Sequence, residues 1–252
     1  MSVTRPVVSQ RKIWRVAEVV ETAEETPRVR TLKLNVADWP GHVPGQHVDV
    51  RLTGEDGSQA QRSYSITSPP EVREISLAVE RLEEGEVSPY LASEVRPGDR
   101  FELRGPIGGY FVWTVEKGGP LVLIAGGSGI APLMSMLRHR AVQKAKFPAT
   151  LLYSARRYEE IIFREELDRM AASDPNLQVA YTLTREQPAS WHGGNKRIDR
   201  DSLMTFVPAP GDRPQIYVCG PSGLVENTAK LLVEIGHARG CIRTERFGPT
   251  GA

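Results

Sequence analysis

The chain has 252 residues, of which 40% are hydrophobic and 25% charged, and this composition excludes a disordered or collagen-like protein. Its length favours two domains of roughly 100 to 150 residues each, although one large barrel is also compatible with it. With 32 basic and 31 acidic residues, the net charge of +1 gives no bulk electrostatic reason to bind nucleic acid or an anionic membrane.

The N-terminal segment and the apolar runs carry no signal for export or membrane insertion. Residues 1–15 are polar and include Arg5, Arg11, Lys12 and Arg15, without the apolar region of a secretory signal. Apolar runs such as Pro120 to Ala125 are far shorter than the roughly 20 residues of a transmembrane helix. We therefore expect a soluble, cytoplasmic protein with a solvated basic tail.

Cysteine is scarce, which limits the metal and redox chemistry that the chain can support. Cys219 and Cys241 are its 2 cysteines, and they do not form a CxxC pair. A disulfide framework and a structural zinc site are therefore not expected, nor is any other metal site. A plant-type [2Fe–2S] cluster needs four cysteine ligands, so this chain cannot hold one by itself.

Short β-type runs separated by Gly, Pro and charged turns fill the first half of the chain, from Ile13 to Trp113. Such spacing predicts an antiparallel barrel or sandwich. A short helix is expected over Val87 to Ala92. The expected strands are Trp14–Val20, Val29–Leu34, Gln46–Leu52, Arg62–Thr67, Glu74–Glu80 and Asp99–Arg104.

After Gly119 the rhythm changes to apolar runs that alternate with amphipathic segments of helix length, which predicts an α/β domain with a parallel sheet. The sequence thus predicts an antiparallel barrel over residues 1–115 and a parallel-sheet α/β domain over residues 116–252. The expected strands are Leu121–Ala125, Ala149–Ser154, Leu177–Leu183, Gln215–Cys219 and Cys241–Glu245, and the expected helices are Pro132–Gln143, Glu159–Ala172, Arg200–Phe206 and Pro221–Ile235.

The strongest local signal is the Gly-rich turn Gly126 to Pro132, which follows the apolar run Leu121 to Ala125. A strand that ends in such a turn and enters a helix presents free backbone N–H groups and a positive dipole end to a pyrophosphate. The spacing differs from GxGxxG, so a generic dinucleotide fingerprint does not describe it. A tight turn without a ligand is the alternative interpretation.

Basic residues follow the other parallel strands, where ligands of open α/β sheets bind. Arg156 and Arg157 follow the second strand, and Arg185 follows the third. Together with Lys196 they favour a phosphate monoester, since guanidinium groups pair well with phosphate. Each of these residues taken alone is better explained as a solvated surface charge.

The first half carries three weaker signals. Arg62 and Tyr64 share one face of a strand by period-two alternation, which suits a phosphate and a flat ring. Gly85 to Ser88 precedes a short helix and offers an anion-binding helix start with Ser88 as its capping residue. Gly105 to Tyr110 is a turn whose glycines allow a ligand to approach.

These motifs follow one another over nearly the whole chain, and in this combination the chain resembles the ferredoxin-NADP reductase superfamily. That family has an antiparallel flavin-binding barrel followed by an α/β domain for a pyridine nucleotide. The markers are RxYS at Arg62 to Ser65, Gly85-x-x-Ser88, GPxG at Gly105 to Gly108, GGSGIAP at Gly126 to Pro132 and CGP at Cys219 to Pro221.

The resemblance implies that the first domain binds FAD. Arg62 would pair with a flavin phosphate, Tyr64 would lie along the isoalloxazine ring, and Ser65 would sit near N5, where hydride arrives. The further flavin-binding candidates are Val79, Gly85, Val87 and Ser88.

The resemblance likewise implies that the second domain binds NADP, with NAD as the alternative. Arg185 lies in a segment that looks like the family's 2′-phosphate element, but Ile198 replaces the family's tyrosine two residues past Lys196. The nucleotide-binding candidates are Gly127, Ser128, Gly129, Arg156, Arg185, Lys196, Gly220 and Pro221.

The C-terminal Glu245-x-Phe247 is similar to the family's terminal Glu-x-aromatic, in which the aromatic ring stacks on the flavin and moves to admit nicotinamide. Phe247 is thus both a cofactor-binding and a catalytic candidate. Cys219 would approach the nicotinamide ring. The catalytic candidates implied by the resemblance are Ser65, Cys219, Glu245 and Phe247.

The leading hypothesis is an oxidoreductase that transfers hydride between NAD(P)H and FAD and exchanges single electrons with a separate carrier, ferredoxin-like or flavodoxin-like. A reductase component of a multicomponent oxygenase, or a free-flavin reductase, is the first alternative. A subunit that transfers electrons without turnover of its own is the second. Docking of an acidic carrier by the basic N-terminal residues is a further alternative to the solvated tail.

Overall fold

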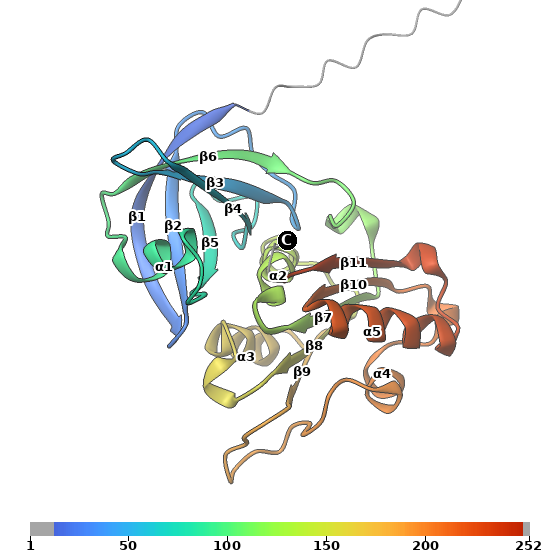
Figure 1. The fold of residues 1–252 in the computed structure, drawn as a ribbon. Coiled ribbons are helices and arrows are strands. Elements are labelled where there is room, and N and C mark those ends of the chain that lie inside the picture. Colours follow the sequence, from blue (N-terminus) through green and yellow to red (C-terminus); the bar gives the residue numbers. More distant parts are fainter. Residues whose placement is uncertain (1–12, 249–252) are drawn as a thin grey trace, which may run out of the picture.

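The computed structural model describes residues 13–248, so Arg5, Arg11 and Lys12 lie outside the described residues. Its first half is an antiparallel sheet of six strands in the order β4-β3-β6-β1-β2-β5 (Figure 1). A bridge between Ile66, directly after β4, and Leu77 in β5 joins the two ends of this sheet, so that it closes as a barrel. The strands are β1 (Trp14–Thr26), β2 (Val29–Val36), β3 (His47–Thr53), β4 (Gln59–Ser65), β5 (Ile75–Glu80) and β6 (Arg100–Ile107).

Alternation of side chains builds the barrel core. Leu32 and Leu34 on β2 and Val48 and Val50 on β3 are fully buried, as strands with one face toward the core require. A short helix α1 (Val87–Pro89) continues into a π-helical turn (Tyr90–Glu94) and packs Val87 and Leu91 into this core.

The second half is a parallel sheet of five strands in the order β11-β10-β7-β8-β9. The chain runs outward from β7 in one direction and then returns to β10 on the other side. The carboxyl ends of β7 and β10 therefore meet at a topological switch point, where ligands of such sheets bind. The strands are β7 (Leu121–Gly126), β8 (Ala149–Ala155), β9 (Leu177–Leu183), β10 (Gln215–Gly220) and β11 (Ile242–Arg246).

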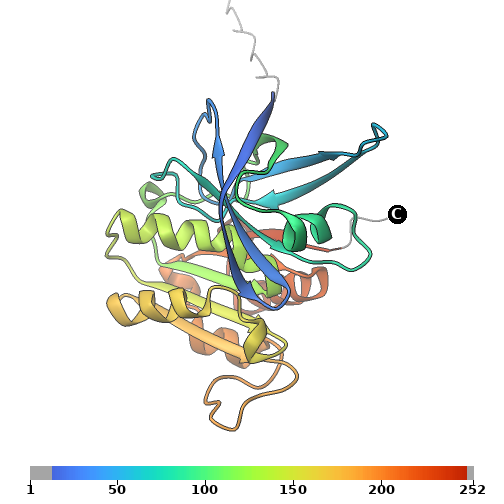
Figure 2. The same cartoon turned by 90° about the vertical axis from the view of Figure 1, so that its left-hand side faces the viewer.

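Helices cover both faces of the parallel sheet. Helices α2 (Ile130–Val142) and α3 (Arg164–Ser173) pack on one face, and α4 (Arg200–Phe206) and α5 (Ser222–Ile235) pack on the other. Figure 2 shows α2 running between the barrel and the rest of the second domain. This position explains why every residue of α2 from Ile130 to Leu137 is buried.

The expected fold class is confirmed, although the bounds of several elements differ from those expected. Strand β1 continues to Thr26, beyond the expected Val20. Helix α3 begins at Arg164 and not at Glu159, because a 3-10 turn occupies Tyr158–Glu160 and Phe163 has a φ of 59° that interrupts the helix. The helix expected over Val87 to Ala92 is split between an α-helical and a π-helical turn.

The linker between β6 and β7 contains a 3-10 turn at Val115–Lys117, and the domain boundary predicted after residue 115 falls in it. That boundary stays a prediction. Among residues 13–248, no helix has both the length and the apolar character needed to cross a membrane.

Candidate functional site

The RxYS segment forms the end of β4, and the residues Thr67 and Ser68 that follow it accept hydrogen bonds from α2 of the second domain. Arg62 is exposed, and its Nη1 donates only to the carbonyl of its neighbour Gln61 at 2.7 Å. Tyr64 packs partly against the barrel core, and burial raises the pKa of its hydroxyl, an effect that nearby Arg62 opposes. Ser65 is 5% exposed, and among the described residues its hydroxyl has no hydrogen-bond partner. Near the end of β4 there are thus a guanidinium without an ion-pair partner among the described residues, a half-buried ring and a hydroxyl without a hydrogen-bond partner.

The segment Gly85 to Ser88 differs in detail from its prediction. Ser88 lies inside the helix and accepts a hydrogen bond from Leu82 N at 3.2 Å, so the prediction that it caps the helix is wrong. The N-cap is Glu86, without a side-chain hydrogen bond. Gly85 packs closely here, since a Cβ on it would lie 2.9 Å from Ser88 Oγ.

Val79 and Val87 are both fully buried in the barrel core. Backbone and side chain of both residues are therefore enclosed in the barrel. The expectation that they bind a cofactor stays a prediction with this restriction.

The Gly-rich turn lies at the carboxyl end of β7, at the topological switch point of the parallel sheet. A 3-10 turn, Gly127–Gly129, links β7 to α2. A Cβ on Gly129 would lie 2.3 Å from Cys219 O, so the absence of a side chain lets this turn pack against the end of β10. Gly127 has a φ of 53°, and a Cβ on it would meet nothing within 4 Å. This turn therefore has one packed side and one open side.

The ends of β10 and β11 bring three of the catalytic candidates together. Cys219 and Glu245 are Cα partners in the parallel register, and Phe247 N donates to Gly220 O at 2.8 Å. Figure 1 shows that these two strands point toward the barrel. Burial, and secondly the charge of Glu245, raises the pKa of the Cys219 thiol. Burial raises the pKa of the Glu245 carboxyl to about 7.

Gly220 and Pro221 form the link from β10 to α5 beside the turn. Gly220 has a φ of 151°, and a Cβ on it would lie 2.9 Å from Gly126 O. Pro221 is exposed. These two positions and the turn Gly127–Gly129 are thus neighbours, as the sequence predicted from separate strand ends.

The predicted phosphate-binding residues divide into free and paired cations. Arg185 N donates to Arg156 O at 3.0 Å, so Arg156 and Arg185 are neighbours, and both are exposed without an ion-pair partner among the described residues. By contrast, Arg157 pairs with Glu186 at 3.3 Å. Lys196 pairs with Asp199 and Asp201, and Asp199 raises the pKa of Lys196. Arg156 and Arg185 are therefore the free cations of this group.

Sequence reasoning missed the residues of α2 that bind the segment after β4. Ser135 Oγ donates to Ser68 O at 2.6 Å, and Arg138 Nη1 donates to Thr67 O at 2.9 Å. His139 Nδ1 lies 2.6 Å from a carboxylate oxygen of Glu71. The only sequence signal for this contact was the presence of polar residues at positions i, i+3 and i+4 of an otherwise buried helix.

The residues present fit FAD and a pyridine nucleotide. The exposed Arg62 guanidinium suits a phosphate, and the open side of Gly127 leaves room for a nucleotide at a helix start. Residues 13–248 contain no group of three or more His, Cys, Asp or Glu placed to hold a metal ion.

Comparison with known proteins agrees with this geometry. The family model of the oxidoreductase FAD-binding domain matches residues 16–112, and that of the oxidoreductase NAD-binding domain matches residues 123–230. The solved FAD/NAD-binding domain of nitric oxide dioxygenase from Vibrio cholerae superimposes with a TM-score of 0.82 at 27% identity, covering 93% of this chain and 99% of that domain.

Two similar proteins are each 31% identical to the chain. NADH-cytochrome b5 reductase 1 of Candida glabrata matches over 90% of this chain and 81% of its own length. The glycine betaine monooxygenase reductase subunit of Chromohalobacter salexigens matches over 92% of this chain and 64% of its own length. With both domain models matched in order and the fold shared, the chain belongs to the ferredoxin-NADP reductase superfamily of FAD-dependent NAD(P)H oxidoreductases.

Proposed function

We propose that the protein transfers hydride between NAD(P)H and FAD and exchanges single electrons with a separate carrier protein. The observation that carries the proposal is that α2, which begins directly after the Gly-rich turn, donates hydrogen bonds to the segment directly after β4. In addition, β10 and β11 point toward the barrel and hold Cys219 beside Glu245 near their carboxyl ends (Figure 1). When bound, FAD accepts the hydride of NAD(P)H, which is two electrons with one proton, and releases the two electrons one at a time.

The chain's own residues would bind and orient the two cofactors. Arg62 would bind a flavin phosphate and Tyr64 would lie along the flavin ring, while the free Ser65 hydroxyl would donate a hydrogen bond at the hydride acceptor. Phe247 would cover the ring until nicotinamide displaces it.

Glu245 and Cys219 would act beside the nicotinamide. A carboxyl with a pKa of about 7 can hold or release a proton near neutral pH. The Cys219 thiol stays protonated, so it would provide packing and a weak donor and not a thiolate nucleophile.

For the nucleotide, we propose a preference for NADPH. Arg156 and Arg185 are exposed neighbours at the ends of β8 and β9, and two free guanidinium groups suit a 2′-phosphate. Lys196 is already paired with two carboxylates and would contribute less. Ile198 is buried at the position where the family has tyrosine, which keeps NADH as the alternative donor.

For the partner, we propose a soluble one-electron carrier of the ferredoxin or flavodoxin type. The chain has 2 cysteines and so lacks the thiolates of a plant-type iron–sulfur cluster. Similarity to the glycine betaine monooxygenase reductase subunit supports a second candidate role, the reductase component of an oxygenase. We place the protein in the cytoplasm.

The test begins with the purified full chain reconstituted with FAD and titrated anaerobically with NADPH and with NADH. We expect a yellow flavoprotein whose absorbance near 450 nm bleaches on addition of NADPH, as for flavins in general. Failure to bind FAD would contradict the proposal. Binding without reduction by either nucleotide would favour a subunit that has no turnover of its own. Screening a ferredoxin, a flavodoxin and free FAD or FMN as acceptors would then separate a carrier reductase from a free-flavin reductase.

A further inference from the structure

Helix α2 contacts both halves of the site. It begins at Ile130, directly after the Gly127–Gly129 turn, and its side chains reach the segment that follows Ser65. Thr67 is 0% exposed and Ser68 is 3% exposed, so the contacted segment is held inside the interface. The nucleotide turn and the end of β4 are thus joined through one helix.

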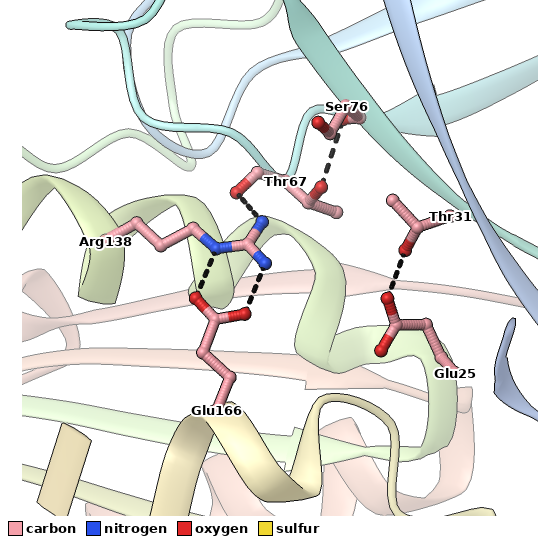
Figure 3. Close-up of polar contacts among 6 residues, drawn as sticks. All are labelled: Glu25, Thr31, Thr67, Ser76, Arg138 and Glu166. Carbon is pink, nitrogen blue, oxygen red and sulfur yellow. Dashed lines mark hydrogen bonds and ion pairs between the residues drawn. The ribbon is translucent and has the colours of Figure 1, made fainter. Parts of the chain in front are cut away.

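Arg138 makes the central contact, which Figure 3 draws. Its Nε and Nη2 donate to the two carboxylate oxygens of Glu166 on α3 at 2.8 and 2.6 Å, and its Nη1 donates to Thr67 O at 2.9 Å. Thr67 is held in turn by β5, because its N and Oγ1 both donate to Ser76 O, at 2.8 and 3.1 Å. A bidentate pair fixes the plane of the guanidinium, so the donor to Thr67 has a defined direction.

Two more side chains of α2 also contact the segment after β4. Ser135 is fully buried and donates to Ser68 O. His139 Nε2 accepts a hydrogen bond from Val115 N at 3.4 Å, which leaves Nδ1 to donate to Glu71. Residues i, i+3 and i+4 of one helix thus hold three points of the segment from Thr67 to Glu71.

Together these contacts connect the flavin side of the site, at Ser65, with the nucleotide side, at the turn Gly127–Gly129. Ser65 lies two residues before Thr67, and Arg138 lies about 13 Å along the helix from Gly129, given a rise of about 1.5 Å per residue. Hydride transfer requires the reacting atoms to be about 3 to 3.5 Å apart, and a misplacement of about 1 Å can reduce the rate about 100-fold. A change in the contacts between Ser65 and the turn Gly127–Gly129 is therefore expected to change the rate of hydride transfer.

We propose that Arg138 is a positioning residue for hydride transfer: through Thr67 it holds Ser65 in place relative to the nucleotide turn Gly127–Gly129. The proposal rests on the proposed function, because it concerns the geometry of that same transfer. Arg138 would touch neither cofactor and would act only through the segment after β4.

The chain supplies a matched control on the same helix. Arg140 is 2% exposed, pairs with Asp174 and donates to Phe147 O at 2.8 Å. Both partners belong to the second domain, which also contains α2. Arg138→Gln and Arg140→Gln each remove one guanidinium from an ion pair on α2. Only Arg138→Gln removes a bond between the domains.

The first experiment measures flavin reduction of the FAD-loaded full chain by stopped flow. For Arg138→Gln we expect the limiting rate of reduction by NADPH to fall on the order of 10- to 100-fold, with little change in the Kd for NADPH. The absorbance of the complex between NADP⁺ and reduced flavin should also weaken, because this absorbance reports contact between the nicotinamide and flavin rings. Arg138→Lys should recover part of the rate. The lysine ammonium can bond to Thr67 O or to Glu166, but it cannot make the bidentate pair with Glu166 and the bond to Thr67 O together, as the guanidinium does.

The second experiment does not depend on turnover. Hydrogen–deuterium exchange of the full chain should show faster exchange over residues 65–77 in Arg138→Gln and wild-type exchange there in Arg140→Gln. If either glutamine variant does not fold, the lysine variants Arg138→Lys and Arg140→Lys replace them in both experiments.

The outcomes separate this proposal from the proposed function. A wild-type flavoprotein that no pyridine nucleotide reduces contradicts the proposed function. A wild type that is reduced normally, with an Arg138 variant reduced at the same rate, overturns the positioning role. An equal loss of rate in the Arg138 and Arg140 variants also overturns it, because the loss would then come from α2 itself.

Discussion

Cys219 and Glu245 are Cα partners on the adjacent parallel strands β10 and β11. Both residues stand near the carboxyl ends of these strands, which point toward the barrel (Figure 1), and burial raises the pKa of both groups. Each group is therefore more protonated in the folded protein than in the unfolded chain, and this shared property yields two measurable expectations.

Replacement of Glu245 should change how stability depends on pH. Its folded pKa of about 7 lies above the usual 4.5, so protonated Glu245 contributes stability that is complete below pH 4.5 and is lost as the pH rises through 7. The glutamine in Glu245→Gln cannot ionise. The free energy of unfolding of this variant, relative to that of the wild type, should therefore increase from pH 5 to pH 8. Urea unfolding at both pH values measures the difference. Glu226→Gln, which removes an exposed carboxylate paired with Arg246 at 3.5 Å, is the control variant.

The two cysteines should differ in reactivity. Cys219 is fully buried with a raised pKa, whereas Cys241 is partly exposed, and alkylation requires an accessible thiolate. We expect iodoacetamide at pH 8 to modify Cys241 first and Cys219 only after unfolding. Peptide mass mapping over time checks this order. Modification of native Cys219 as fast as Cys241 would contradict the buried position of the thiol.

Removal of Arg185 should affect NADPH far more than NADH. A guanidinium–phosphate contact contributes roughly 1.5 to 3 kcal/mol, so Arg185→Ala should raise the KM for NADPH about 10- to 100-fold. Arg156→Ala should act in the same direction. Arg169→Ala on α3, an exposed arginine whose contact with Glu165 is only 4.0 Å, is the control and should change neither KM. Equal effects of Arg185→Ala on both nucleotides would remove the 2′-phosphate assignment.

A side chain at Gly129 should destabilise the nucleotide domain. A Cβ there would lie 2.3 Å from Cys219 O, and backbone atoms cannot move away as a flexible side chain can. We expect Gly129→Ala to lower the free energy of unfolding by about 1 to 3 kcal/mol, as overpacking does. Gly223→Ala, at a helical glycine with nothing within 4 Å of its Cβ, should be neutral or slightly stabilising. Thermal unfolding of both variants provides the comparison.

Local patterns in the sequence were sufficient for the architecture. Alternating runs predicted the barrel strands, and apolar runs followed by amphipathic segments predicted the parallel sheet, because side-chain period and burial are properties of each segment. The Gly-rich turn and the ends of β10 and β11 followed from the same reasoning. The errors were local: Ser88 lies within its helix, and the left-handed Phe163 delays the start of α3.

Only the tertiary structure decided which polar groups are paired and which are free. Arg156, Arg157, Arg185 and Lys196 read alike in the sequence, but they differ in the structure. Glu186 from a distant segment pairs with Arg157, the nearby Asp199 and Asp201 pair with Lys196, and Arg156 and Arg185 stay exposed. The contact of Arg138 with Thr67 joins residues that are 71 positions apart. Composition and periodicity report on neighbours along the chain, whereas ion pairing and burial depend on groups that folding brings together from distant segments.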